Sequence, residues 1–479
     1  MGDLQAALWD RLLDLPSPFF RRYSAGSLTI RAMAIEQIRL LAGPAVVAAA
    51  LVLPIGLFNL GLTFVLQPRL ALFGLLAIVL TAAVMVIFMR SQLPRQRRIQ
   101  AVTRELFGTS LQLVEAVGKL RVAAAERRGF ARWAARLGAL KQAFYDAQLG
   151  FVAMTAFIVA APAIATALIL IGAATLPTGS ISGATFIAFN TAFIQALAAV
   201  TGLVGVATFV SAAVPLYETT RTILEEQRET DVLRSDPGEL RGDVDVSGVS
   251  LRYDADSRLV LDDVSFRARA GEFVAIVGPS GAGKSSIIRV LLGFETPEVG
   301  AVHYDGKELE TLDPRAFRRQ MGVVLQSARL TPGDILTNIV GTRRLTIEDS
   351  WAAAEIAGLA DDIRRLPMGM QTVVSEGAST FSGGQRQRLL IARAVAGRPR
   401  ILLFDEATSA LDNRTQAEVS DAIHRLRATR IVIAHRLSTV ARADRLVVLE
   451  AGRIVQSGTY EELIAIEGPF RRLARRQLA

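Results

Sequence analysis

The first half of the chain alternates long uncharged, apolar runs with basic stretches. No charged residue interrupts residues 41–68, 70–89 or 147–217. A helix of about 20 apolar residues crosses the roughly 30 Å hydrocarbon core of a bilayer, so each run is long enough to span it. Turn-forming residues at 176–180 divide the last run in two. The pattern therefore favours membrane spans over buried core helices, which are shorter, and the four expected spans are 41–67, 70–89, 149–174 and 186–216.

Basic residues are concentrated between the second and third spans, whereas the loops on the opposite side carry only Arg69. Basic loops stay in the cytoplasm, so both chain ends and the segment 90–146 are expected on the cytoplasmic side of the membrane. The membrane expected is the inner cell membrane. Apolar residues recur in this segment at helical spacing, which predicts a hairpin prolonging both spans. We also expect short cytoplasmic helices near 23–32 and 118–126. The segment's basic residues are Arg90, Arg95, Arg97, Arg98, Arg104, Lys119, Arg121, Arg127, Arg128, Arg132, Arg136 and Lys141.

The composition is that of a chain with a membrane-embedded part. Of the 479 residues, 51% are hydrophobic, only 21% are charged and none is cysteine. These totals exclude a disordered chain, a disulfide scaffold and thiol catalysis. The net charge is +9, but much of the excess lies beside the apolar runs, which indicates anionic lipid headgroups as the partner and not nucleic acid. Asp3, Asp10 and Asp14 interrupt the opening turns, so no secretory signal is expected.

The second half alternates β-type runs with helical stretches, which predicts a parallel α/β sheet. The composition becomes polar and acidic after residue 217 and reaches a turn at 235–238. We therefore expect a membrane domain at 1–225, a linker at 226–242 and a nucleotide-binding domain at 243–479. The fold class is multidomain, with an all-α transmembrane domain followed by an α/β P-loop domain. The expected strands are 273–277, 401–404 and 430–434, and the expected helices are 285–294 and 416–427.

A phosphate-binding sequence follows the first of these strands. Residues 278–285 read Gly-Pro-Ser-Gly-Ala-Gly-Lys-Ser and match G-x-x-x-x-G-K-[ST] at every fixed position. Glycine permits the backbone angles that turn successive N–H groups toward one anion, and the following helix adds its N-terminal partial charge. Lys284 can reach the β- and γ-phosphates of ATP, and the Ser285 hydroxyl can ligate Mg²⁺. The alternative, a plain glycine-rich turn, is disfavoured by the flanking strand and helix.

Two adjacent carboxylates follow the strand at 401–404. Asp405, at the strand end, suits the shell of a Mg²⁺ ion, usually through water. Glu406, one residue later, is placed to orient and deprotonate the water that attacks the γ-phosphate. The alternative for Glu406 is a second carboxylate near the metal with no part in proton transfer. Together with Lys284, the pair predicts an ATPase.

Around these residues the chain resembles the ATP-binding cassette (ABC) transporters. Residues 381–385, Phe-Ser-Gly-Gly-Gln, are close to that family's LSGGQ signature, with Phe in place of the usual Leu. The resemblance implies a Q-loop glutamine at Gln326, a D-loop at 409–412, a γ-phosphate contact at His435 and an adenine-stacking Tyr253. Glu376-Gly377 resembles an exporter's cross-linking loop. The catalytic residues implied are Glu406, His435, Gln326 and Lys284. The ATP-binding residues implied are Tyr253, Gly278, Pro279, Ser280, Gly281, Ala282, Gly283, Lys284, Ser285, Ser286, Ser382, Gly383, Gly384, Gln385 and Asp412. The Mg²⁺ residues implied are Ser285, Gln326 and Asp405.

The resemblance also implies a partner chain. In that family ATP is clamped between two cassettes, with the residues matching 278–286 from one and those matching 382–385 from the other. One copy of each motif implies a homodimer or heterodimer of half-transporters that closes on ATP and reopens after hydrolysis. Family exporters carry six spans per half, whereas four are readable here. An incomplete reading frame, a start-site error and a reduced variant are the open alternatives.

A narrower resemblance concerns the cargo. Residues 8–13, 19–22 and 373–380 are similar to bacterial exporters of bacteriocins and of ribosomal peptides with nitrile-hydratase-like leaders. That group implies export of a peptide, and without cysteine the chain cannot trim a leader with a cysteine protease. A lipid or drug exporter, and a truncated membrane ATPase that does not transport, are the alternatives.

Overall fold

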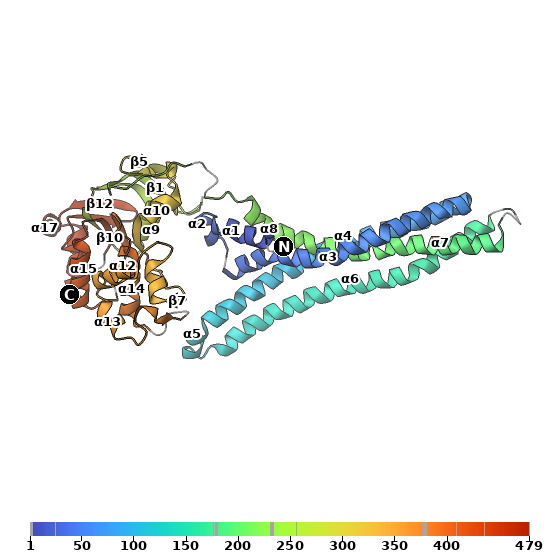
Figure 1. Cartoon of the computed structure of the whole chain (residues 1–479), viewed down its shortest axis with the longest axis horizontal. Coiled ribbons are helices and arrows are strands. Elements are labelled where there is room, and N and C mark those ends of the chain that lie inside the picture. Colours follow the sequence, from blue (N-terminus) through green and yellow to red (C-terminus); the bar gives the residue numbers. More distant parts are fainter. Residues whose placement is uncertain are drawn as a thin grey trace. The chain divides into compact units, whose positions relative to one another are not determined.

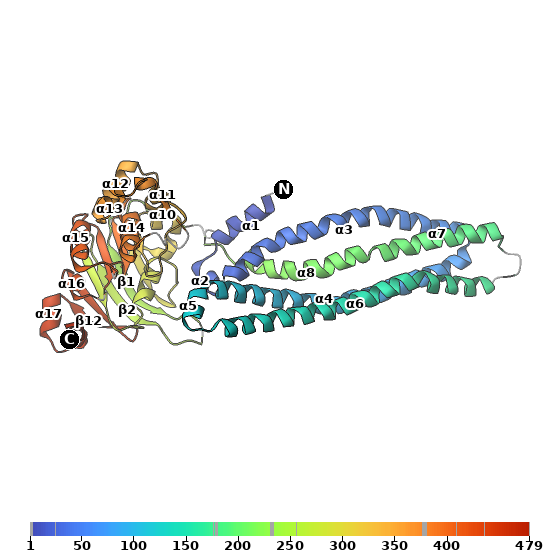
Figure 2. The ribbon, with the colours of Figure 1, turned by 90° about the horizontal axis from the view of Figure 1, so that it is seen from below.

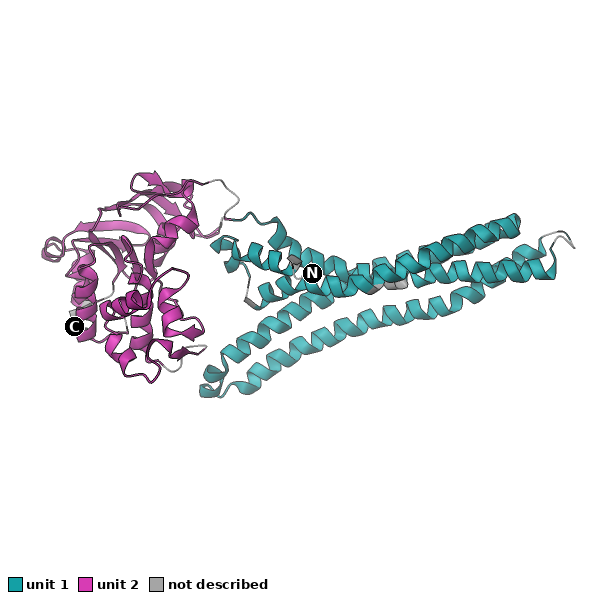
Figure 3. Ribbon diagram, in the orientation of Figure 1, with its two compact units in different colours: residues 1–228 teal, residues 229–479 magenta. Residues whose placement is uncertain are grey.

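In the computed structural model, the chain divides into two units, Met1–Arg228 and Glu229–Ala479 (Figure 3). The first unit is built of helices, and the second combines helices with β-sheets. The predicted fold class, a helical membrane part followed by an α/β part, is confirmed. The structure describes residues 3–23, 25–175, 177, 181–229, 234–254, 256–375, 381–408, 410–434 and 436–478.

The apolar runs of the first unit lie in helices, some of which are much longer than a bilayer is thick. Helix α4 has 48 residues, which at 1.5 Å per residue is about 72 Å, more than twice the hydrocarbon core. Helix α6 packs along α4, and both views show α5 at the turn between them (Figures 1 and 2). The predicted basic hairpin is therefore present. The helices are α1 Asp3–Leu13, α2 Ser17–Arg21, α3 Ala25–Leu66, α4 Pro68–Glu115, α5 Val117–Val122, α6 Glu126–Ala174, α7 Gly183–Gly202 and α8 Val204–Glu225.

Four helices of the described residues are long and apolar enough to cross a membrane, as predicted: Gly26–Leu66, Pro68–Glu115, Glu126–Ala174 and Gly183–Gly202. Large apolar side chains on α3, such as Phe58 and Val65, are exposed, as expected of lipid-facing positions. Two expectations differ from the structure. The run at 186–216 is divided at Leu203 into α7 and α8, and the stretch expected as a short helix near 23–32 becomes the start of α3.

The second unit contains a six-stranded sheet in the order β12-β11-β3-β10-β9-β6, in which only the β12 pairing is antiparallel. A second sheet, β2-β1-β4-β5, is antiparallel and was not predicted. Buried positions on β1 recur at nearly every second residue, whereas those on β2 are three and four residues apart. The strands are β1 Val244–Leu251, β2 Leu261–Ala268, β3 Phe273–Val277, β4 Val299–Tyr304, β5 Lys307–Glu308, β6 Met321–Val324, β7 Gly333–Asp334, β8 Val373–Val374, β9 Ile401–Asp405, β10 Thr429–Ile433, β11 Arg445–Glu450 and β12 Arg453–Gly458.

Helices cover the sheets, and the predicted elements of this unit lie within a few residues of the observed ones. The helix expected at 285–294 is α9, and the one expected at 416–427 is α15. The helices are α9 Lys284–Leu291, α10 Pro314–Arg319, α11 Ile335–Val340, α12 Ile347–Ile356, α13 Ala360–Arg364, α14 Gly383–Val395, α15 Asn413–His424, α16 Leu437–Val440, α17 Tyr460–Ala465 and α18 Pro469–Leu478, with short 3₁₀ turns at Leu309–Thr311 and Gly369–Gln371.

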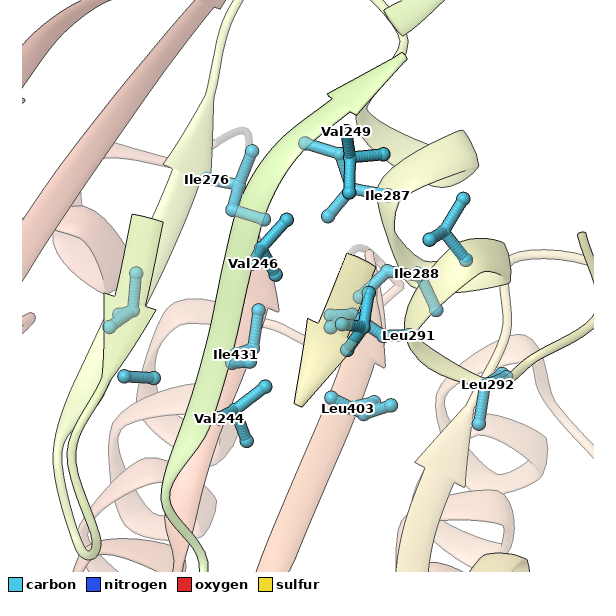
Figure 4. Close-up of a cluster of buried hydrophobic side chains, with 14 of the residues drawn as sticks. Val244, Val246, Val249, Ile276, Ile287, Ile288, Leu291, Leu292, Leu403 and Ile431 are labelled. Carbon is cyan, nitrogen blue, oxygen red and sulfur yellow. The ribbon is translucent and has the colours of Figure 1, made fainter. Parts of the chain in front are cut away.

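Several hydrophobic clusters make up the core of this unit, and two of them hold the helices α9 and α14. Ile287, Ile288 and Leu291 of α9 belong to the first cluster, which also contains side chains of β1, β3, β9 and β10 (Figure 4). Leu389 and Ile391 of α14 belong to the second, with side chains of α11, α12 and α13. Burial of a Leu or Ile contributes about 1.5–3 kcal/mol, so each helix is held firmly by its own cluster. The loops that begin α9 and α14 are therefore anchored in different parts of the core.

Candidate nucleotide-binding site

Parallel strands bring part of the predicted ATP site to one edge of the large sheet. Ile433 of β10 lies opposite both Asp405 of β9 and Ile276 of β3, and Val324 of β6 lies opposite Phe404. The carboxyl ends of parallel strands meet at the same edge, where open α/β sheets bind ligands. The residues that directly follow these ends are Gly278, Glu406 and Ala434, and Gln326 comes two residues after β6.

The loop between β3 and α9 requires glycine where its backbone passes close to neighbouring chain. Gly278 has φ +157°, and a Cβ there would lie 2.1 Å from the Leu449 carbonyl oxygen. Gly283 has φ +101°, and its Cβ would lie 2.7 Å from the Val260 oxygen. A side chain at either position would push the loop out of place. Pro279, Ser280 and Gly281 form the exposed part of this loop and Ala282 is buried.

Lys284 is buried at the start of α9 and its ammonium group is held by the loop. Nζ donates to the carbonyl oxygens of Gly278 at 2.8 Å and Pro279 at 2.9 Å. Burial lowers the pKa of Lys284, and the nearby carboxylates of Glu406 and Asp405 partly offset this shift. The loop carbonyls therefore hold the ammonium group, and the two carboxylates are near enough to stabilise its charge.

The two serines after Lys284 face different surroundings. Ser285 is exposed, so its hydroxyl is accessible to a ligand. Ser286 is buried, and its Oγ lies 2.9 Å from the hydroxyl of Tyr253. The Tyr253 ring packs against the first hydrophobic cluster. The contact ties Tyr253 to the phosphate loop, whereas its stacking on adenine stays a prediction.

Asp405 and Glu406 lie at the end of β9 in different backbone conformations. Asp405 is a strand residue with 4% of its surface exposed. Glu406 has φ +55°, in the left-handed region that non-glycine residues rarely adopt. Its N–H donates to the Ile433 oxygen of β10 at 3.3 Å. A left-handed residue at this position costs on the order of 1 kcal/mol, which the surrounding contacts must offset.

The signature residues form the N-terminus of α14. Ser382 Oγ accepts from the Gln385 N–H at 3.2 Å, and the Gln385 side chain accepts from the Ser382 N–H at 3.0 Å. This capping box uses a lone pair of the serine oxygen and leaves its O–H hydrogen to donate elsewhere. The N–H groups of Gly383 and Gly384 belong to the first turn, where a helix lacks internal acceptors and attracts anions.

Gln326 and the D-loop border a cavity of about 600 Å³ that is also lined by Gly383, Gln387 and Ala410. Its lining brings the Q-loop, the signature helix and the D-loop to one space. Asp412 caps α15, since its carboxylate accepts from the N–H groups of Arg414 and Thr415. These bonds lower the pKa of Asp412, with the Thr415 bonds as the largest cause. Asp412 thus has a local capping role, and contact with ATP stays a prediction.

Several predicted residues lie outside the described residues. They are His435, Glu376-Gly377 within 376–380, and Ser409 of the D-loop. Among the residues that the structure does describe, no three His, Asp or Glu side chains are grouped to hold a metal ion by themselves. A site built from one carboxylate, a hydroxyl and an amide, completed by phosphate and water, is the kind that Mg²⁺ uses.

Two polar residues of this edge were not predicted. Gln387 bonds the Glu406 carbonyl and the Ala410 N–H, and Arg436 donates to the Leu411 carbonyl at 2.8 Å. Each lies next to a predicted motif: Gln387 comes two residues after Gln385, and Arg436 comes one residue after His435. Their contacts depend on residues distant in sequence, so spacing alone could not identify them.

Comparisons with known proteins give matches in both units of the chain. Residues 261–409 match the ABC transporter family, and residues 1–200 match the ABC transporter transmembrane region. The ATP-dependent lipid A-core flippase of Coxiella burnetii is 31% identical over 484 residues, covering 100% of this chain and 82% of the relative. The alpha-hemolysin translocation ATP-binding protein HlyB of Escherichia coli O157:H7 is 32% identical over 471 residues, covering 97% of this chain.

The chain spans 66% of the length of that hemolysin translocation protein. The solved structure of a bacterial Atm1-family ABC exporter with ATP bound superposes with a TM-score of 0.83 at 28% identity. That comparison covers 100% of this chain and 85% of the other. The likeness therefore extends through both units.

Proposed function

Because the chain belongs to the ABC transporter family, as a multipass inner-membrane protein with a cytoplasmic ATP-binding unit, we propose that it is an ATP-hydrolysing half of a dimeric exporter. The observation that carries this proposal is Lys284, held by the Gly278 and Pro279 carbonyls beside Asp405 and Glu406. We assign 1–225 to the membrane domain, 226–242 to the linker and 243–479 to the cassette.

The residues at the sheet edge suit one division of roles. Lys284 and the N–H groups of 278–286 bind the phosphates. When ATP binds, the Lys284 ammonium group exchanges the carbonyl oxygens of its loop for phosphate oxygens, whose negative charge stabilises a buried cation. Glu406 takes a proton from the attacking water, and Gln326 and His435 orient the γ-phosphate and water. Ser285, Gln326 and Asp405 offer oxygen ligands for Mg²⁺, which when bound neutralises charge on the phosphates. Tyr253 stacks on adenine.

The signature residues serve the ATP of a second subunit in this proposal. Helices α9 and α14 are anchored in different clusters, and the Ser382 O–H and the Gly383 and Gly384 N–H groups are suited to bind an anion. Asp412 is the last residue of the D-loop, and we assign it to ATP binding as well. Two copies arranged head to tail would thus complete two ATP sites.

We further propose that the cargo is a peptide, and a pocket of the membrane unit supports this choice. The pocket, of about 200 Å³, is lined by α4, α6 and Ser211 of α8. Gln92, Gln96 and Gln148 contribute amides that can pair with a peptide backbone, and Met89 and Met154 adapt to varied side chains. None of its lining residues in the described part of the chain is charged, whereas an anionic headgroup would favour Arg or Lys.

A lipid cargo is the second candidate, favoured by the flippase relative that matches the whole chain. The two candidates can be separated with the full chain reconstituted in liposomes. We expect a neutral peptide to stimulate ATP turnover. Gln96→Leu with Gln148→Leu should weaken that stimulation about tenfold to a hundredfold, because two hydrogen bonds are lost at about 0.5–1.5 kcal/mol each. Gln112→Leu, at an exposed position of the same α4 helix, is the matched control. Movement of a headgroup-labelled lipid, without any response to peptide, would favour the lipid instead.

A further inference from the structure

The backbone of Glu406 is fixed from two sides. Its N–H donates to the Ile433 oxygen, and its carbonyl accepts from Gln387 Nε2 at 2.9 Å. Because Glu406 has a positive φ, its side-chain direction depends on these two anchors more than it would on a regular strand. The first anchor comes from the sheet. The second comes from α14, which is the helix that begins with the signature residues.

The same Gln387 side chain also holds the D-loop. Its Oε1 accepts from the Ala410 N–H at 2.7 Å. A Cβ on Gly384, one turn earlier, would lie 3.4 Å from the Ala410 oxygen, so α14 packs closely on this loop. One amide thus uses its donor on Glu406 and its acceptor on Ala410. Only an uncharged amide of this length can make both bonds at once.

The next residue of the loop is held from the other side. Arg436 donates to the Leu411 carbonyl at 2.8 Å and to the Gln416 side chain at 2.6 Å. Gln416 is 3% exposed and donates to Thr439 Oγ1 at 2.6 Å. The D-loop is therefore clamped between α14 and a buried polar network. A displacement of α14 would be transmitted to Glu406 and Ala410, because Gln387 joins both residues to that helix.

From these contacts we infer that Gln387 is a positioning residue that couples the signature helix to Glu406 and the D-loop. The inference rests on the proposed dimer, in which the signature of one subunit binds the other subunit's ATP. Gln387 then connects the ATP held at one site to the general base of the other site. Cooperativity between the two sites is the expected consequence.

The experiment compares ATP turnover of the full-length chain with that of Gln387→Leu, which keeps the volume and removes both bonds. We expect kcat to fall on the order of tenfold to a hundredfold, as for a misplaced catalytic group. We also expect KM for ATP to change little and the ATP dependence to change from sigmoidal to hyperbolic. Gln387→Glu keeps an acceptor for Ala410 but loses the donor to Glu406, so its kcat should fall while part of the cooperativity is retained.

The control is Gln371→Leu, a surface glutamine at the end of a 3₁₀ turn, which should behave as wild type. The inference is overturned if folded Gln387→Leu keeps wild-type kcat and cooperativity, or if its loss is explained by a lower melting temperature and smaller active fraction. Absence of turnover in the wild-type chain would instead contradict the proposed function.

Discussion

Replacing Glu406 with glutamine is expected to reduce ATP turnover by about 100-fold or more while ATP binding stays close to the wild-type level. An amide has the size of the carboxylate but cannot accept the proton of the attacking water. The backbone bonds to Ile433 and Gln387 do not involve the side chain, so the left-handed turn is retained. Single-turnover hydrolysis and nucleotide binding, measured on the same preparation, would separate the two effects.

A closed dimer that retains unhydrolysed ATP should accumulate with Glu406→Gln. Glu418→Gln removes a carboxylate from an exposed ion pair with Arg414 and is the matched control, because such pairs contribute little. Wild-type turnover in Glu406→Gln would refute the role of general base and favour that of a second carboxylate near the metal.

Removal of the Lys284 amine should abolish tight ATP binding. In Lys284→Ala the phosphates lose a charge-assisted partner worth about 1.5–3 kcal/mol, and each 1.4 kcal/mol is a factor of ten in affinity. The loop also loses the two bonds that Nζ makes to Gly278 and Pro279. We therefore expect ATP affinity to fall by about tenfold to a hundredfold, measured by equilibrium binding, and turnover to fall with it.

The matched control is Lys307→Ala on β5, because Lys307 also donates to a backbone carbonyl, that of Pro237 at 2.8 Å. If both variants bind ATP equally well, Lys284 has only a structural role in its loop. A reduced melting temperature in Lys284→Ala alone, with normal ATP affinity, would lead to the same conclusion.

Much of the fold could be predicted because its determinants are local in sequence. Membrane spans follow from uncharged runs of sufficient length, and the phosphate loop follows from residues 278–285 between a strand and a helix. Asp405 could be predicted because it stands at the end of an apolar strand. In each case one physical requirement, the thickness of a bilayer or the cradling of an anion, restricts a short stretch of residues.

Other features depend on tertiary contacts that short patterns do not contain. The sequence stays apolar and uncharged across Leu203, so hydropathy predicts one helix over 186–216. In the structure α7 ends at Gly202 and α8 begins at Val204. Strand β2, with sequence LDDVSFRA, is too polar to be recognised from apolar residues alone. The capping roles of Ser382 and Asp412 and the bridge made by Gln387 join residues that only the folded chain brings together.

The central claim, that each ATP site is shared between two subunits, is tested most directly by co-expression of differently tagged variants. Lys284→Ala damages the phosphate loop, and Gly384→Asp places a like charge where the signature would meet the γ-phosphate. A heterodimer with one variant in each chain retains one intact shared site. A heterodimer of wild type with the double variant carries the same substitutions but retains none. We predict vanadate-trapped nucleotide and ATP turnover in the first heterodimer and neither in the second. The opposite pattern, or equal trapping in both, would contradict the account.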